Sequence, residues 1–265
     1  MNQDMTATLP KRNLNGSTLK LIGILTMLFD HVGAVLLKRL ILDGYWEMVY
    51  AGGTQTVKEW LQGHVLLYYG YYVMRAIGRI AFPIFIFLMM EGFEKTGNRW
   101  KYAMRLGLFA LLSEIPFDLA FHAEVLEFTY QNIFFTLLIG FLTMMLLDAI
   151  HKKSWNITGK WILEGICIAM AACVAELLQT DYGAKGILCI MVMFLFRNYR
   201  EQQILAGCVA FLWELPAPLA FIPISHYNGQ RGWKLKYVFY AFYPIHLVAI
   251  HLLCVALGIH RYAVV

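Results

Sequence analysis

The residues whose types suit acid–base chemistry lie inside stretches that are otherwise apolar. An ionisable side chain at bilayer depth costs about 2.5–3.5 kcal/mol even on insertion scales, so each one needs a partner or a role. In chain order they are Asp30, His31, Arg75, Arg79, Glu114, Asp118, Glu214, His246 and His251, joined by the amides Gln131 and Asn132. Such a set indicates either a reaction site or a group of buried ion pairs.

Histidine is the usual general base near neutral pH, and His31 is the candidate base here. Asp30 beside it can orient the imidazole ring, and Arg79 or Asn132 can steady a developing oxyanion. Since no activated nucleophile accompanies these groups, the set suits direct transfer of an acyl group between two bound substrates.

Several other function classes lack support in the sequence. There is no Gly-x-Ser-x-Gly, His-Glu-x-x-His or P-loop pattern, which argues against common hydrolases, zinc proteases and NTPases. The five cysteines show no CxxC spacing, and we predict no metal. The net charge of +5 comes from short basic clusters without an aromatic-lined basic face, so we expect no nucleic-acid partner.

The elements that must position these residues are membrane helices. The chain of 265 residues is 60% hydrophobic and only 15% charged, too few charges for a wetted surface. Its apolar runs are long and continuous, which favours helices over barrel strands. We predict an all-α bundle with a polar cytoplasmic segment at 1–17 and a single transmembrane domain at 18–260. The expected spans are 18–37, 72–92, 102–122, 131–150, 160–178, 183–197, 203–222 and 237–258.

Loop charges predict the orientation of these eight spans. Lys and Arg gather in alternate loops, which is the positive-inside pattern and places both termini in the cytoplasm. Two loops predicted outside, 38–71 and 223–236, carry basic residues against this pattern. For the first we expect a helix over 57–65 lying on the membrane surface. In this topology most of the polar residues share the outer half of the bundle.

A purely structural interpretation stays open. Arg79 with Glu114 or Asp118 would form a buried ion pair that only fixes helix packing. Glu214 and His251 are given a packing role.

Seven motifs in order resemble the TraX family over nearly all of residues 18–250. They are the run ending in Asp30-His31-Val-Gly, Gly78-Arg79-Ile-Ala-Phe82-Pro83, Ser113-Glu114-Ile-Pro116-Phe117-Asp118, Gln131-Asn132-Ile-Phe-Phe-Thr136, Asp181-Tyr182-Gly183, Tyr227-Asn228-Gly229-Gln-Arg231-Gly232 and Tyr243-Pro244-Ile245-His246. The resemblance implies N-terminal acetylation of a conjugative pilin, with acetyl-CoA as donor. The last motif is also similar to the wider group of transmembrane acyltransferases.

On this basis the expected site has three parts. The catalytic set is His31, Asp30, Arg79, Glu114, Asp118, Asn132 and His246. The substrate-binding set is Gln131, Asp181, Tyr182, Asn228, Arg231 and Tyr243. The phosphates of acetyl-CoA would meet Arg99, Lys101, Arg105, Lys152 and Lys153 from the cytoplasm.

The expected location is the inner membrane of a bacterium, with several passes through the lipid bilayer. The acceptor would be a peptide, a pilin, or an envelope glycan or lipid. Two other classes remain: a proton- or ion-coupled transporter using the same charges, and a non-catalytic factor in pilus or envelope assembly.

Overall fold

A computed structural model describes residues 13–233 and 236–264, with the backbone alone at 236–239. Most of the polar segment predicted at 1–17 lies outside the described residues, as does Lys234. The described chain is helical, with two isolated β-bridges, Leu14–Tyr227 and Gln131–Thr180, and no strand within these ranges. The prediction of an all-α fold is confirmed for this part of the chain.

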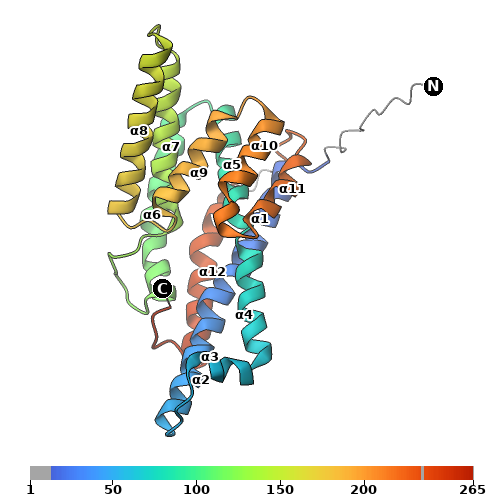
Figure 1. The fold of residues 1–265 in the computed structure, drawn as a ribbon, viewed down its shortest axis with the longest axis vertical. Coiled ribbons are helices and arrows are strands. Elements are labelled where there is room, and N and C mark those ends of the chain that lie inside the picture. The colour runs from blue at the N-terminus through green and yellow to red at the C-terminus, as the bar shows by residue number, and fades with distance from the viewer. Residues whose placement is uncertain (1–12, 234–235, 265) are drawn as a thin grey trace, which may run out of the picture.

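The first helical rod is longer than the predicted span 18–37. Helix α1 (Gly16–His31), a π-helical turn (Val32–Leu37) and α2 (Lys38–Tyr50) form one continuous rod of 35 residues. At 1.5 Å per residue it is about 50 Å long, well beyond a hydrocarbon core of about 30 Å. Helix α2 and the short α3 (Val57–Gly63) project together at one end (Figure 1).

The second rod contains a break that the sequence explains. Helix α4 (Val65–Gly78) and α5 (Ala81–Lys95) are separated at Arg79 and Ile80. Pro83 has no N–H to give the carbonyl of Arg79, and its ring clashes with that carbonyl in a regular helix. The break therefore lies at the candidate residue Arg79. The rod also starts earlier than the predicted span 72–92, because α4 begins at Val65.

Helices α6 (Arg99–Phe121), α7 (Ile133–His151), α8 (Ile157–Leu177), α9 (Gly183–Leu195) and α12 (Lys236–Ala256) agree with the predicted spans within a few residues. The side chains of Asn15, Asn98, Asn132 and Asn156 cap α1, α6, α7 and α8 by accepting hydrogen bonds from backbone N–H groups of the first turns. Asparagine is among the best N-cap residues because it satisfies these otherwise unpaired donors.

The predicted seventh span, 203–222, is wrong as a single helix. The segment contains α10 (Arg200–Ala210), 3₁₀ turns at Leu212–Glu214 and Ala217–Ala220, and the first residues of α11 (Phe221–Ser225). The guanidinium of Arg200 at the start of α10 lies over the ring of Tyr227, just beyond α11. The segment from α10 to α11 therefore forms a hairpin whose tip at Glu214 lies inside the bundle and whose two ends lie together. We call it the re-entrant hairpin.

The re-entrant hairpin changes the relation between the two ends of the chain. The amide of Gly16 donates to the carbonyl of Gln230 (2.7 Å), and Lys95 Nζ donates to the hydroxyl of Tyr227 (3.1 Å). We call this the proximal end. At the other, distal end, the amide of Val264 donates to the carbonyl of Phe121 (2.7 Å). The first and last described residues thus lie at opposite ends of the bundle, and the prediction that both termini share one side is not confirmed.

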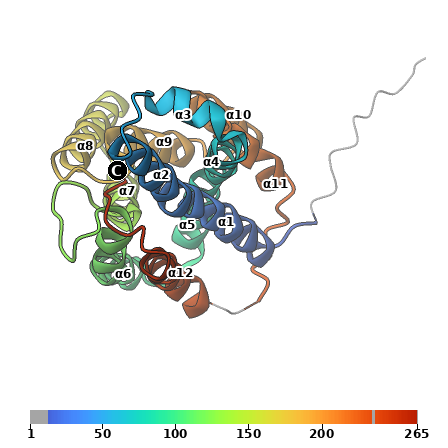
Figure 2. The same ribbon diagram turned by 90° about the horizontal axis from the view of Figure 1, so that it is seen from below.

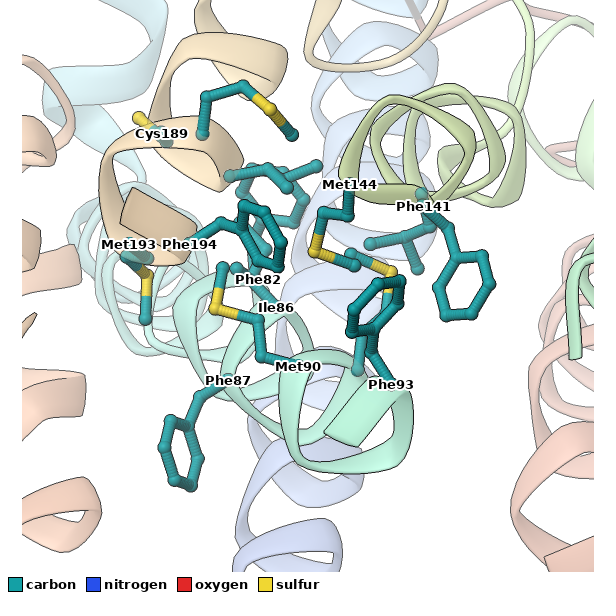
Figure 3. Close-up of a cluster of buried hydrophobic side chains, with 14 of the residues drawn as sticks. Phe82, Ile86, Phe87, Met90, Phe93, Phe141, Met144, Cys189, Met193 and Phe194 are labelled. Atoms are coloured by element: carbon teal, nitrogen blue, oxygen red, sulfur yellow. The ribbon is translucent and has the colours of Figure 1, made fainter. Parts of the chain in front are cut away.

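The core lies between α5, α7 and α9. Phe93 of α5 meets the rings of Phe141 (5.3 Å between centroids) and Phe194 (5.4 Å) edge to face. Phe82, Ile86 and Met90 lie on the side of α5 that faces Met144 of α7 and Cys189 and Met193 of α9, whereas Phe87 points away from them and meets the ring of Tyr227 (Figure 3). Viewed along the rods, the other helices surround this centre (Figure 2).

The outer surface is apolar. Four helical rods within the described residues are long and apolar enough to cross a membrane: Gly16–Tyr50, Val65–Lys95, Ile133–His151 and Ile157–Leu177. Only 11% of the most apolar window of α8 is buried, and Trp161, Ile162, Ile166 and Met170 point outward. Large apolar side chains exposed over a whole helix face suit contact with lipid. The chain is a helical membrane protein.

Candidate functional site

Two cavities within the bundle approach the same residues from opposite ends. The distal cavity has a volume of about 420 Å³ and the proximal cavity about 550 Å³. Asp30, His31, Asp181 and Tyr182 line both. Four of the predicted site residues therefore converge, from α1 and from the turn between α8 and α9.

The distal cavity extends away from this junction toward Lys38 and Val264, and the proximal cavity toward Gly16 and Lys95. The contacts of these residues place them at the two ends defined above. A ligand from either end would reach the same four side chains.

His31 is held by a second histidine from a distant part of the chain. Its Nδ1 lies 2.6 Å from Nε2 of His246, whose Nδ1 lies 2.7 Å from the carbonyl oxygen of Phe242. The rings of Phe121 and Tyr243 meet His31 edge to face, at 5.6 and 5.8 Å between centroids. The π-helical turn begins at the residue after His31, and such turns are frequent at functional sites.

Asp30 does not orient the His31 ring, although the two are adjacent in sequence. Its Oδ2 accepts a hydrogen bond from Nη1 of Arg75 at 2.6 Å. Gly78 makes this approach between α1 and α4 possible, because a Cβ there would lie 2.1 Å from the Cβ of Asp30.

Arg79 also pairs differently from the proposed structural interpretation. Its Nη1 lies 2.7 Å from Oε1 of Glu214, not against Glu114 or Asp118. Glu214 lies at the tip of the re-entrant hairpin and lines the distal cavity together with Arg79. The packing role given to Glu214 from the sequence overlooked this position.

Asp181 and Tyr182 close the junction from the α8–α9 turn. The hydroxyl of Tyr130 donates to Oδ1 of Asp181 (2.5 Å), and Tyr182 stacks on Phe82 with 3.7 Å between centroids. Burial raises the pKa of Asp181 to about 6, while the hydrogen bond from Tyr130 opposes that rise. The carboxyl therefore changes charge near neutral pH.

Four predicted catalytic residues line neither cavity: His246, which lies behind His31, and Glu114, Asp118 and Asn132. Asn132 Nδ2 donates to Glu114 Oε2 and, at 2.8 Å, to the carbonyl of Ala110. Asp118 Oδ2 accepts from the amide of Glu127 at 3.0 Å. These contacts hold α7 and the loop before it against α6. Glu114, Asp118 and Asn132 thus form hydrogen bonds that stabilise the packing of α6 against α7 and its preceding loop.

The predicted substrate-binding residues are divided. Arg231 and Tyr243 line the proximal cavity. Gln131 instead joins the two turns at the ends of α7 and α8, where the amide of Asp181 donates to its carbonyl (2.9 Å). The side chain of Asn228 accepts from the amide of Gln230 (2.9 Å) and shapes the loop that covers the start of α1.

The predicted phosphate-binding residues are likewise divided. Arg105 lines the proximal cavity, where its buried Nε has no hydrogen-bond partner among the residues that the structure describes. Arg99 and Lys152 both pair with Asp148, and Lys101 and Lys153 are exposed outside the lining. Arg231, described above, lines the same cavity, as do Lys20 and Lys95, which sequence reasoning did not assign.

The distal cavity also contains residues that sequence reasoning did not select. Arg75 belonged to the ionisable set but received no role, and Lys38 lies in the loop 38–71, whose basic residues break the positive-inside pattern. Tyr130, Lys185 and Trp213 carried no signal, because their position depends on how the turns fold inward. No group of three or more His, Cys, Asp or Glu suited to a metal occurs in the part of the chain that the structure describes.

The comparisons with known proteins agree with this membrane fold. The family described as "TraX protein" matches residues 15–254. The chain is also 25% identical to the probable fimbrial assembly protein FimC, serogroup H1, of Dichelobacter nodosus, over 92% of this chain and 97% of that protein. No solved structure matches. The family match includes both histidines and every residue shared by the two cavities, and the chain belongs to the TraX protein family.

Proposed function

We propose that this protein is a membrane acyltransferase that takes an acetyl group from acetyl-CoA at the proximal end and gives it to an acceptor amine or hydroxyl at the distal end. The observation that carries the proposal is the meeting of two cavities at His31. A donor and an acceptor held on opposite sides of one base react directly, without a covalent enzyme intermediate.

The proximal end faces the cytoplasm in this proposal. Lys95, Arg99, Lys152 and Arg197 lie there, and the re-entrant hairpin brings Arg231 to the same end. The basic loop 223–236, an exception to the eight-span topology, then follows the positive-inside rule. The chain would cross the bacterial inner membrane seven times, with the segment after α12 outside.

The chemistry follows from the residues at the junction. The acceptor nitrogen or oxygen attacks the thioester carbon while Nε2 of His31 takes its proton. The C–S bond then breaks, and the leaving thiolate takes the proton back from His31, so one proton is moved and none is lost. Arg79 lies in the distal cavity and is the better oxyanion partner, since the amide of Asn132 is engaged elsewhere.

The proximal cavity suits an anionic, elongated donor. Lys20, Lys95, Arg105 and Arg231 line it, while Glu91 is the carboxyl that joins them and Asp30 and Asp181 lie at the junction with the distal cavity. The buried Nε of Arg105 meets no acceptor within the described part of the chain, as expected for a group that binds a phosphate. Tyr102, Tyr240 and Phe85 supply apolar walls along the same cavity.

The distal cavity suits an acceptor that carries an amine. Its lining holds the carboxyls of Asp30, Asp181 and Glu214 together with the cations Lys38, Arg75, Arg79 and Lys185. Asp30 and Glu214 are paired with Arg75 and Arg79, so Asp181, which Tyr130 holds, is the carboxyl that would meet an amine. An entering ammonium group would give one proton to the Asp181 carboxylate, and the neutral amine would then attack as described above. The name of the fimbrial relative makes a pilin or fimbrial peptide N-terminus the first acceptor to test.

The test is acetyl transfer by the purified protein in lipid vesicles. Labelled acetyl-CoA is supplied with a membrane extract, and mass spectrometry identifies what becomes acetylated. We expect labelling with the intact protein and with His226→Ala, a histidine outside both cavities, and loss of labelling with His31→Ala. Full transfer by a folded His31→Ala protein would contradict the assignment.

The name of the relative also favours a second candidate, a non-catalytic factor in fimbrial assembly. That function would persist in cells after His31 and Arg79 are both replaced, whereas the acyltransferase function would not. Vesicles that show ion flux without acyl transfer would instead point to a transporter.

A further inference from the structure

His246 has one nitrogen whose hydrogen-bonding role is fixed by its partner. Its Nδ1 lies 2.7 Å from the carbonyl oxygen of Phe242, one turn earlier on α12. A carbonyl oxygen can only accept, so Nδ1 of His246 carries the hydrogen. In the neutral ring the other nitrogen, Nε2, is then an acceptor.

This assignment determines the state of the second ring. Nε2 of His246 lies 2.6 Å from Nδ1 of His31, so Nδ1 of His31 must be the donor of that hydrogen bond. In a neutral His31 the lone pair consequently lies on Nε2, the nitrogen that does not face His246. His31 lines both cavities, while His246 lines neither.

We infer that His246 is a positioning residue, which holds His31 in the Nδ1-protonated tautomer and leaves Nε2 of His31 free to act as the base. This inference replaces the role expected for Asp30 and gives His246 a part that differs from direct catalysis. It deepens the proposed function, on which its kinetic test depends.

The packing around the two rings supports a positioning role. The His31 and His246 rings are nearly parallel, at 4° and 4.9 Å between centroids, and Phe242 stacks on His246 at 12° and 4.8 Å. His246 is buried, with 5% of its surface exposed. Its ring can therefore neither turn away from His31 nor reach a substrate easily.

The arrangement also accounts for the charge that forms during transfer. When Nε2 of His31 takes a proton, the Nδ1–H continues to donate to His246, so no proton has to pass to the second ring. The acceptor is a neutral imidazole, in contrast to the carboxylate that orients histidine in Ser-His-Asp enzymes.

The first test measures the tautomer and needs no substrate. Long-range ¹H–¹⁵N spectra of histidine-labelled protein in detergent distinguish the two neutral tautomers, and a His31→Ala sample assigns the signal. We expect His31 with its hydrogen on Nδ1 in the intact protein and a shift toward the Nε2-protonated form in His246→Ala. A His31 ring protonated on Nε2 in the intact protein, or unchanged in His246→Ala, would overturn the inference.

The second test is kinetic and uses two amides of different length. The oxygen of glutamine at 246 can occupy the place of Nε2 and accept from His31, whereas asparagine reaches only the place of Nδ1. We expect kcat to fall by about 10²–10⁴-fold in His246→Ala and His246→Asn, with KM for the donor unchanged, and His246→Gln to recover a large part.

The two tests separate this inference from the proposed function. If no variant and no intact protein transfers an acyl group, the proposed function fails while the tautomer measurement still decides the role of His246. If His246→Gln and His246→Asn are equally impaired while all variants stay folded, the positioning role is wrong.

Discussion

Arg79 Nη1 lies 2.7 Å from Oε1 of Glu214, and this ion pair joins the break in the second rod to the tip of the re-entrant hairpin. The side chains are 29% and 10% exposed, and both line the distal cavity. The hairpin is thereby tied to the same residue that the proposed mechanism uses for the oxyanion.

Removing one partner of this pair should destabilise the protein more than removing both. Glu214→Gln leaves the Arg79 charge without its carboxylate, and we expect a loss of about 1–3 kcal/mol. The double variant Arg79→Gln/Glu214→Gln should recover part of that loss, as measured by thermal unfolding in detergent. If the loss of the double variant equals the sum of the two single losses, the Arg79–Glu214 interaction does not stabilise the protein.

The orientation of the chain can be tested by cysteine accessibility. We expect Gly229→Cys, beside Lys95 at the proximal end, to react with an impermeant thiol reagent only from the cytoplasmic side. Arg261→Cys, beyond α12 at the distal end, should react only from outside. A cysteine-free parent provides the background, and Lys153→Cys the cytoplasmic reference. Labelling of positions 153 and 261 from the same side would restore the eight-span topology.

The re-entrant hairpin also shows where sequence reasoning about the fold ends. The stretch 203–222 has the length and apolar content of a span, and these properties do not distinguish a crossing from a hairpin that reverses halfway. Pro216 and Pro218 were the available signal, because proline interrupts a regular helix. The other spans could be predicted from the length of their apolar runs, because a segment in contact with lipid must form its own backbone hydrogen bonds as a helix.

The candidate site could be predicted only in part, because sequence patterns do not show which helices pack together. Motif position selected His31 and His246, which are 215 residues apart and which the structure brings together. Glu114 and Asp118 are four residues apart and so share one face of a helix, but spacing within one helix cannot show which other helix that face meets. The partners of Arg79 and Asp30 depend on crossings that only the packed structure reveals.

The close approach of α1 and α4 predicts a strong effect at Gly78. A Cβ at this position would lie 2.1 Å from the Cβ of Asp30 and 2.2 Å from its Oδ1, so the helices must separate. We expect Gly78→Ala to cost about 1–3 kcal/mol and to loosen the Asp30–Arg75 pair. Gly70→Ala on the same helix is the control, because its Cβ would meet Leu37 at an ordinary 3.6 Å. Equal unfolding temperatures for the two variants would contradict this account.

The raised pKa of Asp181 predicts a particular pH dependence of stability. Because burial raises this pKa from 3.8 to about 6, the folded state favours the protonated carboxyl. The stability that it contributes below pH 4 is lost as the pH rises to about 6. Asp181→Asn cannot ionise, so relative to the parent it should gain about 2 kcal/mol between pH 4.5 and pH 7.5.

Thermal unfolding of the two proteins across that pH range measures the difference directly. Tyr130→Phe removes the hydrogen bond that favours the carboxylate, so it should steepen the pH dependence of the parent. A difference between Asp181→Asn and the parent that does not change with pH would show that Asp181 titrates at its ordinary value.

The lining of the proximal cavity predicts which basic residues bind the donor. Arg105 and Arg231 line it, so Arg105→Gln and Arg231→Gln should each raise the KM for acetyl-CoA about tenfold, with kcat little changed, because a phosphate contact is lost. Lys153→Gln should leave KM unchanged, since Lys153 lies on the same end but outside the lining. Arg99→Gln should lower the unfolding temperature instead, because Arg99 is engaged with Asp148. If Lys153→Gln raised KM as much as Arg105→Gln, the basic residues would act only through the overall charge of that end, and the proximal cavity would not be the donor site.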